Sequence, residues 1–316
     1  MNLSSLQIIT LLQIKNCGIK STFFIANYIS ENENIDIKTL DDLLNLIKNL
    51  KQNKILKRFP DLEINDLQEA ENTAKLIIKR SQEENIKIIN YYDKEYPEQL
   101  RHTVNEKGKE DPPIILYYKG DISITSRPGI AVIGSREPTK EGLIAGEYLS
   151  SKFAEKGFNI ISGLAIGCDT VGHKGAIKVH GKTTAILANG LDTVYPKQNE
   201  LLAKKILENG GLLLSENPVG TPINRYNLVA RDRLQAALAL VTLVIQTGVK
   251  GGTMHAANTT LISNKPLYCI WYKDEIVRNN EKVLGNELLV SKGAEYIKSD
   301  FNIDDILLIS DKKKNN

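Results

Sequence analysis

From residue 130 onward, short apolar runs rich in β-branched residues alternate with longer segments of helical periodicity. The runs at residues 130–134 and 159–162 end in Gly and Ser, and they flank a helical pattern that closes at Gly157. This order is typical of two parallel strands joined by a helix. Further strands are predicted at residues 183–188, 211–216, 240–247 and 266–271, with helices at 141–156, 170–180, 198–208, 228–239 and 254–263. The alternation predicts an α/β fold with a doubly wound, mainly parallel sheet and right-handed crossovers.

The first 84 residues have helical periodicity only. Apolar positions between Leu3 and Ile14 form one stripe, and Ser21, at the end of a turn, is expected to cap a helix over residues 22–30. The Gly-containing turn resembles that of a helix-hairpin-helix, which presents backbone amides to a DNA phosphate, but such turns are also common in modules that only pack. Further helices are predicted at residues 40–50 and 67–84.

These patterns divide the chain into three parts. Residues 1–85 are predicted to form a small helical domain of helix-hairpin-helix or SAM-like type, and residues 86–310 the α/β domain. Residues 311–316, rich in Lys and Asn, are expected to be a disordered tail.

Two predicted strands, at residues 87–90 and 114–120, connect the helices to the regular alternation. Tyr91, Tyr92 and Tyr96 lie between them. Aromatic rings can stack on nucleobases, but tyrosines more often cover the edge of a sheet, and we favour the packing role.

Composition narrows the class of protein only a little. The net charge of +3 is mildly basic, so any site for a polyanion must be a local patch. Cys17, Cys168 and Cys269 are widely spaced and odd in number, which predicts neither a disulfide framework nor a metal site and favours a reducing cytoplasm. We expect no signal peptide, because Met1–Ser5 has no basic residue, and no membrane span.

Small and polar residues follow nearly every strand of the predicted sheet. Because the carboxyl ends of parallel strands share one edge, these residues are expected to line one extended groove. They are Gly134, Ser135, Ser162, Gly163, Gly167, Asn189, Gly190, Gly251, Gly252 and Thr253. Glycine lets a phosphate approach the backbone, and the amides at the start of the next helix favour negative charge. The sequence therefore predicts a phosphate-recognising site, for a nucleotide or a polynucleotide.

Basic residues occur in or beside the same loops. Arg136 directly follows the Gly134–Ser135 turn, which makes a phosphate contact its expected role. The other basic candidates are Lys174, Lys197, Arg225, Arg231 and Arg233, together with Lys140 and Lys250. Together they would supply the phosphate contacts that dominate affinity for nucleic acid, although Lys140, Lys174 and Lys250 are equally compatible with solvated helix ends.

No catalytic pattern is complete. The loop after residue 133 lacks the dinucleotide Gly-x-Gly-x-x-Gly motif, and no Walker motif occurs, so we expect no cofactor. Asp169, His173 and His180 could share a helix face and hold a metal, but Asp169 follows a Gly turn where a helix cap is expected. Ser162 lacks the Gly-x-Ser-x-Gly elbow of a nucleophile. We therefore predict a binding protein without catalytic or metal-binding residues.

At this point the sequence resembles a known family, the DNA-processing protein A (DprA/Smf) proteins of bacteria. The motifs that carry the resemblance are Gly134-Ser135-Arg136-x-Pro-Thr139, Ser162-Gly163-Leu164-Ala165-x-Gly167-x-Asp169, Gly190-Leu191-Asp192-x-x-Tyr195-Pro196-x-x-Asn199 and Arg231-x-Arg233. The resemblance implies a Rossmann-like core that binds single-stranded DNA without catalysis, hands it to a RecA-type recombinase during natural transformation, and forms a homodimer. It implies a DNA contact for Arg136 and adds Thr139 and Asn199 to the candidate site.

The sequence departs from the family pattern at several places. The family usually has Arg-Asn-Arg where this chain has Arg231-Asp232-Arg233, and Ser-Gly-Ser where it has Gly251-Gly252-Thr253, followed by an unusual His255. We see no counterpart of the winged-helix domain that many members carry after the core. These differences indicate a divergent member.

A competing hypothesis belongs to a different class of proteins. Nucleotide phosphoribohydrolases and nucleotide-binding sensors share the broad fold, and Gly251-Gly252-Thr253 is similar to their phosphate turn. The enzymes need a glutamate soon after that turn, and residues 254–260 contain none. Glu216 is the alternative carboxylate, for which we favour a structural role at the end of a strand. This hypothesis leaves a role in defence against foreign DNA open.

Overall fold

The computed structural model describes residues 2–57, 59–298 and 306. The chain forms two compact units, one of residues 1–96 with 114–117, the other of residues 97–113 with 118–316. The domain boundaries proposed from the sequence stay a prediction, and the proposed tail at residues 311–316 lies outside the described residues.

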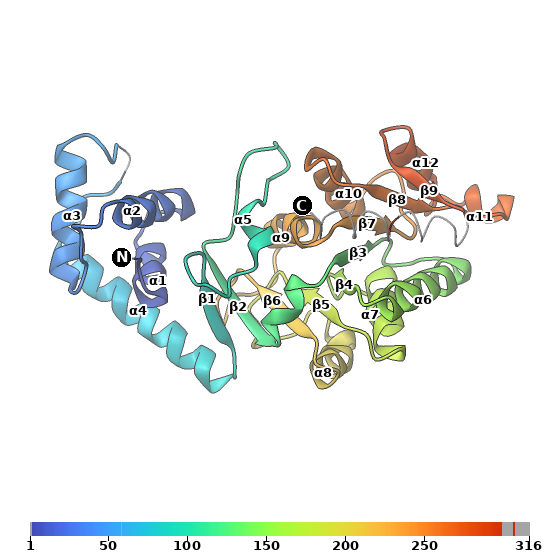
Figure 1. Cartoon of the computed structure of the whole chain (residues 1–316), viewed down its shortest axis with the longest axis horizontal. Helices are drawn as coiled ribbons and strands as arrows, with labels where there is room; N and C mark the ends of the chain where they lie inside the picture. Colours follow the sequence, from blue (N-terminus) through green and yellow to red (C-terminus); the bar gives the residue numbers. More distant parts are fainter. Residues whose placement is uncertain (1, 58, 299–305, 307–316) are drawn as a thin grey trace. The chain divides into compact units, whose positions relative to one another are not determined.

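Helices make up most of the first unit (Figure 1): α1 (Ser5–Gln13), α2 (Ile19–Glu31), α3 (Leu40–Gln52) and α4 (Ile64–Glu83). α1 packs against α2 and α4, and α3 also packs against α4. Ile8 of the predicted apolar stripe is buried, and so are Ile25 of α2 and Ile47 of α3, as expected for helices that pack through one apolar face. The prediction of an N-terminal helical region is confirmed.

The expected cap of the second helix was wrong. α2 begins at Ile19 with Gly18 as its N-cap residue, and Ser21 lies inside the first turn. The amides of Ser21 and Thr22 both donate to the carbonyl of Gly18, which already closes the helix before Ser21. A glycine in extended conformation can serve as the N-cap residue without a side-chain hydrogen bond. The prediction chose Ser21 because serine is a common N-cap residue.

Two strands flank the tyrosine-rich segment, β1 (Lys87–Asn90) and β2 (Ile115–Gly120). The ring of Tyr91 contacts the ring of Phe23 on α2 edge to face, with centroids 5.1 Å apart, and it also contacts the ring of Tyr96, which is buried. These tyrosines pack among themselves and against the helices, as we favoured. α5 (Glu98–Arg101) and a 3-10 turn, η1 (Ile122–Ser126), belong to the second unit.

The second unit is built on a parallel sheet. Its strands are β3 (Gly129–Ile133), β4 (Asn159–Ser162), β5 (Thr183–Ile186), β6 (Leu212–Ser215), β7 (Val241–Val244), β8 (Leu267–Ile270) and β9 (Glu295–Ile297). They lie in the order β6-β5-β4-β3-β7-β8-β9, and every adjacent pair among them is parallel. Each predicted strand is present; β5, β6 and β8 are two residues shorter than predicted, and β7 is four residues shorter. The predicted mainly parallel α/β fold is confirmed.

Helices cover both faces of this sheet (Figure 1). They are α6 (Lys140–Glu155), α7 (Cys168–Lys178), η2 (Lys197–Asn199), α8 (Glu200–Glu208), α9 (Arg225–Leu238), α10 (Gly252–Ile262), α11 (Glu275–Arg278) and α12 (Leu284–Val290). On one face Ile130 and Val132 pack with Phe153 of α6 and Val171 of α7. On the other face Ile133 packs with Met254 and other residues of α10. Alternate strand residues thus supply two cores, as expected when both faces of a sheet are covered.

The strand order places a topological switch point between β3 and β7. After β3 the chain winds through β4, β5 and β6 on one side, and it then returns to β7 on the other side of β3. The loops that follow β3 and β7 therefore diverge to helices on opposite faces. In open parallel sheets, ligands bind in the crevice outside the carboxyl ends of the strands at such a point.

Among the described residues, no helix is both long enough and apolar enough to cross a membrane. Cys17, Cys168 and Cys269 are buried free thiols. Burial raises the pKa of Cys168 and of Cys269 to about 12.

Candidate functional site

A cavity of about 610 Å³ lies at the switch point, and we call it the groove. Its lining comes from the ends of β3 and β7, from the loop before α7 and the start of α7, from α9 and from the start of α10. Nine of the residues that the sequence singled out line it: Gly134, Ser135, Arg136, Arg225, Arg231, Lys250, Gly251, Gly252 and Thr253. The sequence thus placed the loops of β3 and β7 together correctly, because both strands deliver their carboxyl ends to the same edge.

The first wall of the groove is the turn after β3. The amide of Ser135 donates to the carbonyl of Gln246 at 2.7 Å, and the carbonyl of Ser135 accepts from the amide of Cys168 at 3.1 Å. Gly134 packs so closely on Cys168 that a Cβ there would lie 2.5 Å from its sulfur. The turn is therefore held to the segment after β7 and to α7 through its backbone, which leaves the exposed Arg136 side chain available to a ligand.

The second wall is the start of α10. Gly251 has φ of +125°, a conformation that favours glycine, and it is the N-cap residue of the helix. Gly252 and Thr253 follow as the first helical residues, and the exposed Lys250 precedes them. The first amides of a helix lack intrahelical acceptors and carry partial positive charge, so this wall favours an anion.

The third wall is α9, which begins after Asn224 caps the amide of Asn227 at 2.8 Å. The residues of α9 that line the groove are Arg225, Leu228, Val229, Arg231, Asp232 and Gln235. Most are spaced three or four apart, as expected for one face of a helix. Leu228, Val229, Asp232 and Gln235 were not among our candidates. Helical spacing from Arg225 could have identified them.

Three cations around the groove are exposed: Arg136, Arg225 and Lys250. No ion pair or hydrogen bond joins their side chains to any other residue in the described part of the chain. The neighbouring Glu137 is instead paired with Lys282 at 2.8 Å. Because no carboxylate neutralises them, these cations give the rim of the groove a positive potential, which attracts a polyanion.

Arg231 forms the floor of the groove and is buried. Its guanidinium donates to the carbonyl of Ile186 at the end of β5 and, at 3.2 Å, to Oδ1 of Asp232. Gly163 packs directly on this guanidinium, since a Cβ at that position would lie 1.9 Å from Nη1. Glycine at position 163 therefore makes the room that Arg231 occupies.

Asp169 holds the loop that contains Gly163. One of its oxygens accepts from the amides of Gly163 and Ala165, at 3.0 and 3.2 Å. Burial raises the pKa of Asp169, and the charge of Arg231 together with these amides opposes the rise. The expectation that Asp169 caps α7 was wrong, because Gly167, with φ of +82°, is the N-cap residue.

A smaller cavity of about 60 Å³ shares Arg136 and Arg231 with the groove. It extends the site toward the ends of β4 and β5, where Gly163 and Asn189 line it. The Nδ2 atom of Asn189 donates to the carbonyls of Gly190 and Thr193, so Asn189 also fixes the loop after β5. Gly190 belongs to this loop but not to the lining.

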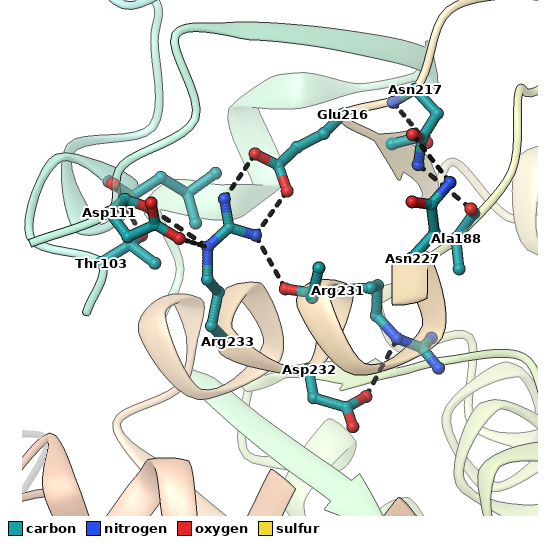
Figure 2. A network of polar contacts seen from close by, with 12 residues as sticks. Thr103, Asp111, Ala188, Glu216, Asn217, Asn227, Arg231, Asp232 and Arg233 are labelled. Atoms are coloured by element: carbon teal, nitrogen blue, oxygen red, sulfur yellow. Dashed lines mark hydrogen bonds and ion pairs between the residues drawn. The ribbon is translucent and has the colours of Figure 1, made fainter. Parts of the chain in front are cut away.

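Arg233 does not line the groove and belongs instead to a network of polar contacts (Figure 2). Its guanidinium makes two hydrogen bonds to the carboxylate of Glu216, one of them 2.7 Å long, and an ion pair with Asp111 at 2.8 Å. A further bond to the carbonyl of Ala230 occupies the same group. Burial lowers the pKa of Arg233, but the charges of Glu216 and Asp111 outweigh burial and raise it. The structural role that we favoured for Glu216 is thus confirmed.

Three further candidates use their side chains to hold the scaffold together. Ser162 donates to the carbonyl of Val132 at 2.6 Å. Thr139 caps α6 and bonds to the side-chain amide of Gln246. Asn199 donates to the carbonyl of Leu164 at 2.8 Å.

The remaining candidates do not line the groove. Lys174 is exposed on α7, and Gly167 lies against the carbonyl of Ser135. Lys197 is exposed and lines a separate cavity of about 590 Å³ beside α8. The structure thus brings together nine of the candidate residues around the groove and leaves these three at its periphery or outside it.

The histidines of the metal hypothesis do not converge on Asp169. His173 is fully buried and bonds through Nδ1 to Thr183 at 2.7 Å, whereas His180 is exposed beyond the end of α7. Burial, with a further contribution from Arg231, lowers the pKa of His173 to about 3. Within the described residues, no group of three or more His, Cys, Asp or Glu side chains is placed to hold a metal ion.

The fold and the groove define a class: a doubly wound parallel α/β protein with an anion-attracting crevice at its switch point. The sequence model of the DNA recombination-mediator protein A family matches residues 87–308. The chain belongs to this family.

Several relatives carry the same assignment. The chain is 32% identical to Protein Smf of Synechocystis over 227 residues, which are 71% of this chain and 54% of that protein. It is 30% identical to the DNA processing protein DprA of Bacillus subtilis over 195 residues, 61% of this chain and 63% of the relative. The matches thus span roughly half to two thirds of these relatives' own length.

Solved structures show the same fold. DprA from Streptococcus pneumoniae superposes with a TM-score of 0.73 over 95% of this chain and 96% of its own, at 23% identity. DNA processing protein A from Helicobacter pylori, a structure described as giving insight into its single-stranded DNA binding mode, superposes with a TM-score of 0.60 at 29% identity, over 71% of this chain and 95% of its own.

Proposed function

We propose that the groove binds single-stranded DNA and does not catalyse a reaction on it. The observation that carries this proposal is the set of three exposed, unpaired cations, Arg136, Arg225 and Lys250, around a crevice where the amides of α10 also favour phosphate. The DNA binding named for the Helicobacter pylori relative supports the same assignment.

The form of the groove favours a strand over a single small ligand. The cations come from three separate elements, the β3 loop, α9 and the α10 loop, so they can contact successive phosphates. The groove continues into the smaller cavity beside Asn189. A bound strand can therefore extend from the groove into the smaller cavity.

We extend the proposal to the pathway that the resemblance implies. The family is described as a mediator of DNA recombination, which supports a protein that protects incoming single strands and loads a RecA-type recombinase in natural transformation. In this proposal the active form is a homodimer in the cytoplasm.

A gel-shift titration with oligo-dT tests the proposal. We expect binding that weakens steeply with salt, and we expect Arg136→Ala to weaken it by about fivefold or more, since one phosphate contact is lost. Lys178→Ala is the control, because Lys178 is exposed at the far end of α7 and is paired with Glu147. Unchanged affinity in Arg136→Ala would contradict the groove assignment.

The same titration separates the alternative class. A duplex of equal length and a nucleoside monophosphate serve as competitors. We expect neither to displace oligo-dT at equal nucleotide concentration. Displacement by the monophosphate would favour a nucleotide sensor or a phosphoribohydrolase-like enzyme instead.

A further inference from the structure

We propose that Asp232 makes the groove read a base, and that it favours guanine over thymine. This inference rests on the proposed binding of single-stranded DNA and specifies which strands the groove prefers. It concerns a carboxylate that lines the groove together with the cations Arg136, Arg225 and Lys250.

Asp232 faces the groove from α9 and is 9% exposed. Its Oδ1 atom accepts from Nε of Arg231 at 3.2 Å. Its Oδ2 atom has no hydrogen-bond partner within the described part of the chain. Figure 2 shows that Asp232 and Arg233 leave α9 on different sides, so the carboxylate does not belong to the network of Arg233. A carboxylate oxygen that is nearly buried and unpartnered has acceptor capacity left for a ligand.

The surrounding charges decide which part of a strand meets Asp232. Phosphates are attracted to Arg136, Arg225 and Lys250 and repelled by a carboxylate. Asp169 is the other acid that lines the groove, but it is only 6% exposed and its Oδ2 atom already accepts from two loop amides, so it is less accessible to a ligand than Asp232. When the phosphates follow the cations, the group that can approach Asp232 is therefore the edge of an unstacked base.

Base chemistry then sets the preference. The Watson–Crick edge of guanine offers two neighbouring donors, N1–H and the N2 amino group, which match the two oxygens of a carboxylate. Thymine offers one donor, N3–H, between two carbonyl oxygens that a carboxylate repels. Adenine and cytosine offer an amino group beside an unprotonated ring nitrogen, so they are expected to rank between guanine and thymine.

The ionisation of Asp232 permits this reading near neutral pH. Burial raises its pKa to about 6, and the neighbouring Asp169 adds to the rise, while Arg231 and His255 oppose it. The carboxylate is therefore mostly charged at pH 7.5. The guanine preference should shrink at pH 5, where the protonated carboxyl group no longer presents two acceptors.

Fluorescence anisotropy tests the proposal with oligo-dT and with the same strand carrying a few isolated guanines. We expect wild-type protein at pH 7.5 to bind the guanine-containing strand about fivefold or more tightly. In Asp232→Asn the ratio of the affinities for the guanine-containing strand and oligo-dT should fall to near one. The affinity for oligo-dT itself should rise, because a negative charge has been removed from the groove. Asp192→Asn is the matched control, since Asp192 lies outside the groove and its Oδ1 accepts from the amide of Gly220, as an amide oxygen also can.

A second measurement needs no variant. Deoxyinosine lacks the N2 amino group of guanine, so its substitution for guanine should remove most of the preference of the wild-type protein. The role of Asp232 would be overturned if the wild type bound the guanine-containing and deoxyinosine-containing strands equally well. It would also be overturned if folded Asp232→Asn kept the wild-type ratio of affinities for the guanine-containing strand and oligo-dT. Absence of salt-dependent binding to any of the strands would instead overturn the proposed function itself.

Discussion

Two sets of cations in the α/β unit differ in what surrounds them. Arg136, Arg225 and Lys250 are exposed around the groove without acidic partners in the described chain. Arg231 and Arg233 are buried, and each contacts at least one carboxylate. In the sequence all five occur beside the same kind of loop. The difference teaches that residue type marks the region of a site, whereas burial and pairing decide which cations remain available to a ligand.

The paired arginines have a separate task. Arg233 connects α9 to Glu216 at the end of β6 and to Asp111 in the segment before β2. Arg231 connects α9 to the end of β5. Because α9 carries Arg225 and Asp232, these connections fix where the wall of the groove lies.

The largest effect is expected from Arg233→Met. This change leaves the carboxylates of Glu216 and Asp111 without their cation, so the free energy of unfolding should fall by about 3 to 5 kcal/mol. Urea unfolding followed by circular dichroism measures it. The double variant Arg233→Met/Glu216→Gln should be no less stable than Arg233→Met alone, because one orphaned charge is removed. A stable Arg233→Met protein with weakened DNA binding would place Arg233 with the exposed set instead.

A smaller effect of opposite sign is expected from Asp232→Asn. The pKa of Asp232 is raised to about 6 in the folded protein, above about 4 for an unfolded aspartate. Its contribution to the stability of the folded state is therefore fully present below about pH 4 and is lost as pH rises through 6. At pH 8 the variant should therefore be more stable than wild type by about 1 to 3 kcal/mol. Below pH 4 the two should be equally stable. Thermal melts across this range measure the difference, and a less stable variant at pH 8 would contradict it.

The smallest change in stability is expected from Arg225→Ala. This exposed side chain has no partner in the described residues, so the free energy of unfolding should change by no more than about 0.5 kcal/mol. The affinity for oligo-dT should still fall several-fold, and the slope of log affinity against log salt should decrease by about one. A loss of stability without a change in slope would move Arg225 into the buried set.

The periodicity of the sequence predicted the sheet, its helices and the edge at which the groove lies. Those features follow from hydrophobic patterns that repeat along whole elements. The directions of individual side chains were not accessible in the same way. Arg231, Asp232 and Arg233 are consecutive on α9, and successive residues of a helix point about 100° apart. Arg231 therefore lies at the floor of the groove, Asp232 faces the groove from its side, and Arg233 joins the network with Glu216.

Local caps were the other weak point. Ser21 and Asp169 have the residue types of helix caps, yet Gly18 and Gly167 occupy the cap positions. At Asp169 the competing partners were two amides of the loop before α7, those of Gly163 and Ala165, which sequence patterns do not reveal. Propensity identified residues that accept from backbone amides but not which amides they would meet.

The close fit of Gly163 on Arg231 constrains how the two positions can change during evolution. A lineage that keeps the arginine must keep glycine at position 163, because even a methyl group would collide with the guanidinium. A lineage that shortens the side chain at position 231 frees position 163 to vary and opens a void under the groove. The residues at positions 163 and 231 should therefore co-vary across related sequences.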